Sequence, residues 1–144
     1  SMGGKAHAKR RDMDADRFAA KALDRRRKRL LKLAADLKGV DDQARHDARI
    51  AAKKLRYAAE AFAPLFDADA KPFIKSVKQL QEELGALNDA AVAAELVARL
   101  RLKGAGLAAA RTLLAAREAA KPKSVKGAVK AMERLAGSPA FWVI

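Results

Sequence analysis

The chain contains no cysteine, and only 5% of its 144 residues are aromatic. Without cysteine, a disulfide scaffold, a thiolate nucleophile and a cysteine-based zinc or iron–sulfur site are all excluded. No apolar run approaches the roughly 18 to 20 residues that a membrane span requires, and no leader resembles a signal peptide. We therefore expect a soluble protein of the cytoplasm.

The motifs of common catalytic and cofactor sites are also missing. The chain has neither a GxxxxGK[ST] phosphate loop nor a GxGxxG motif, and its serines lie in no nucleophile motif. There are two histidines, and one of them, His7, lies in an expected tail, so no metal constellation is predicted. The acids form no cluster that would hold Mg²⁺ against a phosphate. We predict no enzyme activity, no metal and no cofactor.

Strand-forming runs are absent, whereas alanine and leucine dominate a composition that is 51% hydrophobic. This composition predicts an all-α protein, a bundle of four to five helices within one domain. Ser1 and Met2 look like an expression scar, and residues 1–11 are interpreted as that scar followed by a flexible basic lead-in. The helical domain is expected over residues 12–144.

Hydrophobic periodicity and capping residues predict helices over 16–37, from Asp41 or Asp42 to about 66, from 72 to about 101, 107–119 and 124–137. A kink is expected near Gly85 or residues 88–89, and a break at Lys121 and Pro122. The apolar terminus, residues 141–144, is predicted to dock on the bundle as a hydrophobic lid. A self-association patch is the alternative interpretation.

Basic residues far outnumber acidic ones, since 31 Lys and Arg against 17 Asp and Glu leave a formal charge of +14. Such an excess attracts polyanions. On a helical wheel, the stretch HDARIAAKKLRYAAEAF places one polar row opposite its apolar stripe. This row consists of His46, Arg49, Lys53, Arg56, Tyr57 and Glu60.

The flanking helices repeat the pattern. The helix over 16–37 carries six cations and no acid in one arc, among them Arg25, Arg29 and Lys32. The helix that begins near residue 72 has, across from its apolar stripe, Lys75, Lys78, Gln81, Asn88 and Asp89. Each face alone is typical of a solvated surface. Three such faces on successive helices predict a basic groove or channel, in which arginine forks, lysines, His46 and Tyr57 hold phosphates without transforming them.

Two sequence blocks support this hypothesis. The run H-x-x-R-I-x-x-K-K-L-R-Y-x-x-E-x-F over 46–62 and the run K-x-L-Q-x-x-L-G-x-L-N-D over 78–89, with a closing P-A-F-W, resemble the CHAD (conserved histidine α-helical) domain. The resemblance implies a helical bundle that binds inorganic polyphosphate through a basic surface, and in some members association with polyphosphate granules. Residues marked by the family pattern are His46, Arg49, Lys53, Arg56, Tyr57, Lys78, Gln81, Asn88 and Asp89. Glu60 and Asp89 are expected to orient neighbouring cations.

CHAD domains usually contain two similar helical halves, and this chain resembles one half. Two interpretations stay open: a short form that forms a homodimer to rebuild the missing half, or a piece of a longer protein. The competing function is sequence-nonspecific nucleic-acid binding. It is less favoured because Tyr57 is the one aromatic residue on a basic face, whereas single-strand binders interleave several aromatics for base stacking. Membrane-surface binding is weaker still, since the apolar stripes are needed for the core.

Overall fold

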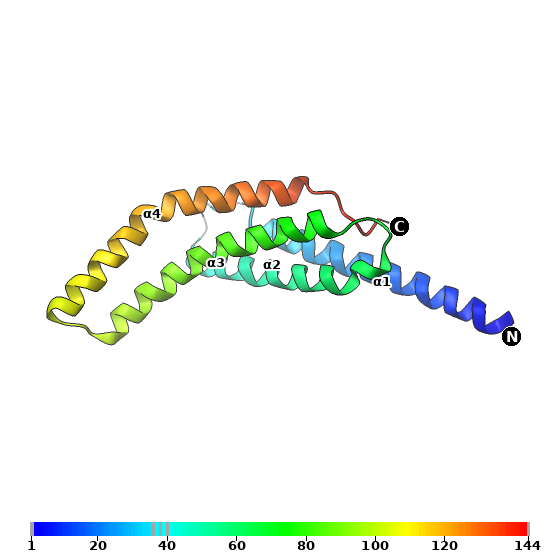
Figure 1. The fold of residues 1–144 in the computed structure, drawn as a ribbon, viewed down its shortest axis with the longest axis horizontal. Helices are drawn as coiled ribbons and strands as arrows, with labels where there is room; N and C mark the ends of the chain where they lie inside the picture. Colours follow the sequence, from blue (N-terminus) through cyan, green and yellow to red (C-terminus); the bar gives the residue numbers. More distant parts are fainter. Residues whose placement is uncertain (1, 36, 38, 40, 144) are drawn as a thin grey trace.

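The computed structural model describes residues 2–143 apart from 36, 38 and 40, and side chains from residue 14 onward apart from these three and residue 122. The elements are α1 (Met2–Leu33), α2 (Asp42–Phe62), the short 3₁₀ helix η1 (Ala63–Leu65), α3 (Lys71–Leu100) and α4 (Gly104–Gly137). The described residues contain no strand. The predicted all-α bundle is confirmed (Figure 1).

Helix α1 differs from its prediction at both ends. It begins at Met2 rather than near Asp16, because residues 2–15 are rich in alanine, lysine and arginine, which propagate a helix readily. It ends at Leu33 rather than at Leu37, although Leu37 is still buried in the connection that follows. The side chains of the expected lead-in, His7 included, lie outside the described residues, so the extent of the domain stays a prediction.

Helix α4 is continuous, so the predicted break at Lys121 and Pro122 is wrong. Proline lacks an N–H and crowds the preceding turn, which bends a helix without always ending it. Figure 1 shows such a bend between the yellow and the orange part of α4. Helix α3 is likewise one element through Gly85, with Pro72 in its first turn as predicted, and the cap of α2 is Asp41, whose Oδ1 accepts from the Ala44 amide at 2.8 Å.

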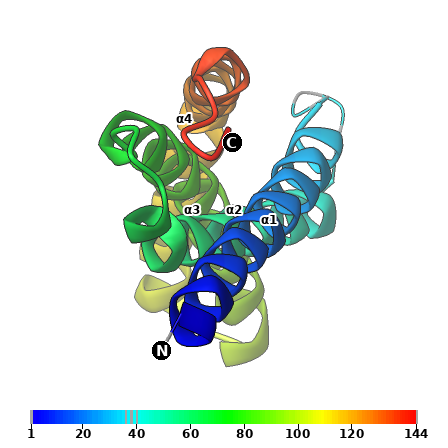
Figure 2. The same ribbon diagram turned by 90° about the vertical axis from the view of Figure 1, so that its right-hand side faces the viewer.

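Helix α2 packs between α1 and α3, and α4 packs on α3 (Figure 2). The side of α2 turned to the core is mostly alanine: Ala48, Ala51, Ala52 and Ala59 are buried beside Leu55. Small side chains let α1 and α3 approach this helix closely. The larger core residues come mainly from α1, α3 and α4, namely Leu23, Leu30, Phe73, Val77, Leu80, Leu84 and Leu135.

The C-terminal segment closes the bundle between α4 and α1, where Figure 2 shows it in red. Phe141 and Trp142 are buried, and the Trp142 ring meets Phe73 edge to face with centroids 4.8 Å apart. Trp142 Nε1–H donates to Asp24 Oδ1 at 2.7 Å. Arg27 Nη2 donates to the carbonyls of residues 136 and 138 at 3.1 Å each. The lid prediction is confirmed for Phe141 and Trp142; residue 144 lies outside the described residues.

Beyond the start of α2, the helices α3 and α4 continue together as a hairpin (Figure 1). We call residues 90–120 the α3–α4 arm. It carries several large apolar side chains that are more than half exposed, namely Val92, Leu96, Leu100 and Leu113. Among the described residues, no helix is both long and apolar enough to cross a membrane.

Candidate functional site

Two contacts define how α2 and α3 lie against each other. His46 Nδ1–H donates to Asn88 Oδ1 at 3.2 Å. Three residues further along α2, the Arg49 guanidinium lies against Gly85, three residues back along α3. Helices α2 and α3 are therefore antiparallel. Because both rise by the same distance per residue, each step forward along α2 corresponds to an equal step back along α3.

The same register brings the next polar residues of the two helices opposite each other. It places Lys53 opposite Gln81 and Arg56 opposite Lys78. Lys53 and Lys78 are exposed, whereas Gln81 is half-buried and its Oε1 has no hydrogen-bond partner in the described part of the chain. We call this surface the α2–α3 face; its members are His46, Arg49, Lys53, Arg56, Tyr57, Lys78, Gln81 and Asn88.

Gly85 determines where Arg49 can lie. A methyl group at residue 85 would be 3.3 Å from Arg49 Nε and 3.9 Å from its Nη2. The missing side chain therefore lets the guanidinium rest on α3, with Nε buried and without a hydrogen-bond partner in the described structure. No acid among the described residues forms an ion pair with Arg49. Packing thus positions this cation and leaves its charge uncompensated.

Tyr57 organises the other end of the face. The half-exposed ring has Lys53 Nζ at 5.9 Å and Arg56 Cζ at 5.1 Å from its centroid. Cations are attracted to an aromatic face within about 6 Å. Arg56 Nε is also 3.5 Å from Glu60 Oε1, which is the orienting geometry expected of this acid. Tyr57 and Glu60 hold two neighbouring cations in place.

The predicted residues of α1 lie elsewhere. Arg29 lines a hollow of about 230 Å³ between α1 and α2, together with Arg26, Lys54, Asp47, Ile50 and Ala51. Arg25 lines an adjoining hollow on α1 beside Phe18 and Lys21. The expectation that all three basic rows gather in one groove is therefore corrected: two basic surfaces border α2 on opposite flanks. Lys32 is exposed and lines neither hollow.

Two predicted residues of α3 lie toward the solvent side of the α2–α3 face. At 100° per residue, Asp89 and Lys75 lie about 20° and 60° round the helix beyond Lys78. Both are exposed, and within the described structure Asp89 pairs with no cation. Its expected role of orienting a neighbouring cation has no support in these contacts, unlike that of Glu60.

Some arginines stabilise the fold rather than line a basic surface, and the sequence pattern does not distinguish these two kinds of cation. Arg45 is 6% exposed, and its Nη2 donates to the Leu37 carbonyl at 3.1 Å, which ties the α1–α2 connection to α2. Arg27 holds the C-terminal segment. Conversely, Arg26 and Lys54 line the α1–α2 hollow and were not singled out from the sequence. In the sequence, Arg26 is marked only by its place in the RRRK run, and Lys54 only by its place in the KK pair.

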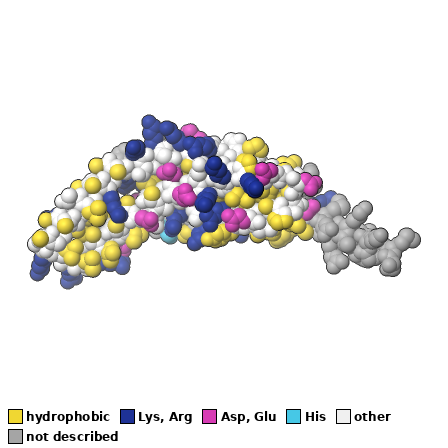
Figure 3. All heavy atoms as spheres, viewed as in Figure 1, with side chains coloured by type: hydrophobic (Ala, Val, Ile, Leu, Met, Phe, Trp, Pro, Cys, Tyr) yellow, Lys and Arg dark blue, Asp and Glu magenta, His cyan; other side chains and the backbone are white. Residues whose placement is uncertain are grey.

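The hollow between α3 and α4 is charge-balanced. This hollow of about 280 Å³ is lined by Gln79, Glu82, Glu83, Gly127, Lys130, Ala131 and Arg134. Figure 3 shows dark blue and magenta side chains interspersed over the middle of the molecule, and dark blue ones gathered along the top, over α4. Arg134 Nη1 donates to Gln79 Oε1 at 3.0 Å. This hollow therefore offers an anion no surplus of positive charge. In the described ranges, no group of three or more His, Cys, Asp or Glu could hold a metal ion.

The family model of the CHAD domain matches residues 3–98 of this chain. The chain belongs to the CHAD family. CHAD domains are associated with polyphosphate binding in general. The matched range includes nearly all of α1, α2 and α3, and thus the whole α2–α3 face, whereas α4 and the C-terminal segment lie beyond it. Searches of curated proteins and of solved structures returned no match.

Proposed function

We propose that the chain is a non-catalytic module that binds inorganic polyphosphate, and that the α2–α3 face is its binding surface. The observation that carries the proposal is the row of cations along α2, of which packing and Tyr57 hold Arg49 and Lys53 without an acid, and Glu60 pairs with Arg56 alone. Arg49, Lys53 and Lys78 form no ion pair in the described structure, so their charge is available to an anion. Association with polyphosphate granules would follow from the same binding.

The cations suit a flexible chain of phosphates. His46, Arg49, Lys53 and Arg56 recur about once per helical turn, which is every 5.4 Å along α2. A linear polyanion running along the helix therefore meets a positive group at each turn. Much of the affinity then comes from release of the counterions condensed on the polyanion, so binding weakens as salt rises.

The individual donors have separate tasks in this proposal. The Arg49 and Arg56 guanidinium groups grip phosphate oxygens through paired N–H donors, whereas Lys53 and Lys78 act as flexible point charges. His46 uses Nδ1–H for Asn88, so it can donate to a phosphate only from Nε2, with both ring nitrogens protonated. Glu60 is held by Arg56 and acts as a positioning group.

Nucleic-acid binding is the second candidate, because sequence-independent contact with a phosphate backbone needs only cations. The environment of Tyr57 argues against base recognition. Lys53 and Arg56 both lie over its ring, and a nucleobase would have to displace them in order to stack there. Polyphosphate has no bases and meets no such competition.

A salt titration tests the proposal. We expect binding to long-chain polyphosphate to persist at ~150 mM salt, where binding to single-stranded DNA at equal phosphate concentration is largely lost. Fluorescence anisotropy of labelled polyanions, with the unlabelled ones as competitors, measures both affinities. Equal affinities that fall together with salt would mean that +14 is a general polyanion attractor, and the proposal would be abandoned.

The Gly85→Ala variant should lower the affinity for polyphosphate without lowering the stability of the fold. Alanine in a helix interior is more favourable than glycine by roughly 0.5–1 kcal/mol, so the free energy of unfolding should stay equal or rise. The new methyl group, 3.3 Å from Arg49 Nε, pushes the guanidinium back by a few tenths of an ångström, and the polyphosphate affinity should fall roughly three- to tenfold, or about 0.7–1.4 kcal/mol.

Gly106→Ala is the matched control for this variant. Gly106 also lies in a helix, but a methyl group there meets no atom within 4 Å. Stability should again stay equal or rise, while affinity does not change. A Gly85→Ala protein that binds as tightly as the parent chain would show that the position of Arg49 is irrelevant to binding.

A further inference from the structure

An apolar row on α3 extends past the point where α2 begins. Leu84 and Asn88 belong to a row at four-residue spacing that continues as Val92, Leu96 and Leu100 and turns by about 40° per step, so it leaves the flank that faces α2 toward the tip of the arm. The register set by His46 and Asn88 places Asp42, the first residue of α2, opposite Val92. Leu96 and Leu100 therefore lie past the start of α2. We call Val92, Leu96 and Leu100 the arm stripe.

The arm stripe is uncovered in the single chain. Its three side chains are 53%, 54% and 56% exposed, whereas Leu84 in the same row is fully buried. Helix α4 lies on another flank of α3, where Ala90, Ala91 and Ala94 line a hollow with residues of α4. Figure 3 shows the arm, at the left, as mostly hydrophobic and uncharged, with basic groups towards its tip. A contiguous apolar patch of this kind is typical of an interaction site.

We propose that a second copy of this chain covers the arm stripe, with the two α3 helices antiparallel about a two-fold axis at Leu96. In this arrangement Leu96 meets Leu96 of the other copy, and Val92 meets Leu100. Both copies use the same patch, as a closed two-fold dimer requires. The helix of the second copy thereby covers the side of the arm's α3 that α4 does not cover.

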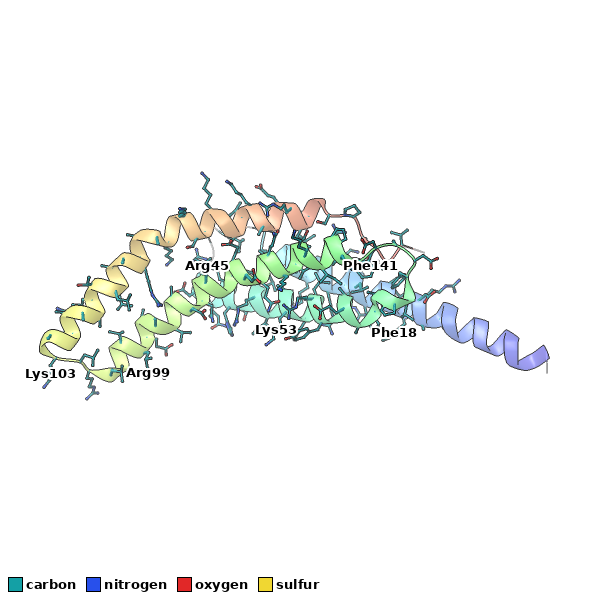
Figure 4. The ribbon with its side chains drawn as sticks, viewed as in Figure 1. Phe18, Arg45, Lys53, Arg99, Lys103 and Phe141 are labelled. Atoms are coloured by element: carbon teal, nitrogen blue, oxygen red, sulfur yellow. The ribbon has the colours of Figure 1, made fainter. Side chains whose placement is uncertain are left out.

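Charge selects this pairing over the parallel one. Asp89 lies seven residues before Leu96 and Lys103 seven residues after it, and both are exposed. Figure 4 shows Lys103 and Arg99 at the tip of the arm. Antiparallel pairing brings each Asp89 toward the basic tip of the other copy, where Arg99 and Lys103 lie. Parallel pairing would place the two Asp89 side chains together and the two basic tips together, which is unfavourable.

Site-specific crosslinking tests the geometry, and the absence of cysteine makes single-cysteine variants clean. With a short bis-maleimide and no polyanion present, Leu96→Cys should crosslink to itself efficiently. Val92→Cys and Leu100→Cys should crosslink better when mixed than when treated separately. Leu113→Cys is the control: residue 113 is equally exposed but lies on α4, outside the stripe, and it should stay largely uncrosslinked.

Sedimentation of charge-reversal variants tests the dimer independently of crosslinking. A short stripe predicts a weak dimer, so sedimentation should be followed over roughly 10 μM to 1 mM protein. Asp89→Lys should raise the dimer dissociation constant at least tenfold, and Asp89→Lys/Lys103→Asp should restore it. A monomer throughout this range, or Leu96→Cys crosslinking no better than Leu113→Cys, would overturn the proposal. Neither measurement involves polyphosphate, so the proposed function is tested separately.

Discussion

Replacing Arg49, Lys53 and Arg56 together by alanine should lower the affinity for long-chain polyphosphate at least about a hundredfold at ~150 mM salt. Hydrogen bonds to charged groups contribute about 1.5–3 kcal/mol each, so losing three corresponds to at least two factors of ten. The slope of log K against log salt should also shrink by roughly 2, because fewer counterions are released. Anisotropy titrations at several salt concentrations measure both changes.

A charge-matched variant shows whether the location of these cations matters. Lys123→Ala/Lys126→Ala/Lys130→Ala removes the same three charges from exposed positions of α4. We expect this variant to retain affinity within a few-fold of the parent chain, and circular dichroism should show both proteins folded. If the two triple variants lose affinity equally, binding follows net charge, and the α2–α3 face is not the site.

Replacing Trp142 by alanine should destabilise the bundle by about 3–5 kcal/mol, the usual cost of truncating a buried large aromatic side chain. Trp142 is 2% exposed and meets Phe73 and Phe141 edge to face at 4.8 Å and 5.1 Å. The variant also loses the hydrogen bond from Nε1 to Asp24 Oδ1. Urea unfolding followed by circular dichroism measures the change in free energy.

The neighbouring residue supplies the control. Val143 is 78% exposed, so Val143→Ala should change stability by less than about 0.5 kcal/mol. Trp142→Phe keeps an aromatic ring but not the N–H, and should fall between the parent chain and Trp142→Ala. Equal stability of Trp142→Ala and Val143→Ala would mean that the C-terminal segment does not hold α4 against α1.

Local patterns in the sequence predicted much of the fold. The apolar stripes of α2 and α3 include the observed core residues Ala48, Leu55, Val77 and Leu80, because a helix buries one face whatever it packs against. The predicted break at Lys121 and Pro122 was wrong because it depends on more than the local sequence. Whether Pro122 ends a helix or bends it depends on packing on both sides of the proline, which local sequence does not contain.

The sequence by itself determined the all-α class, the family, the excess of positive charge and the polar row of α2, since these depend on residue types and on periodicity within one helix. Only the tertiary structure decided which cations share a surface. It placed Arg49 on Gly85 and Arg29 in a separate hollow with Lys54, and it buried Arg45. It also left the arm stripe uncovered. The physical reason is that the register between helices, and the point where one helix stops covering another, depend on contacts between residues far apart in the chain.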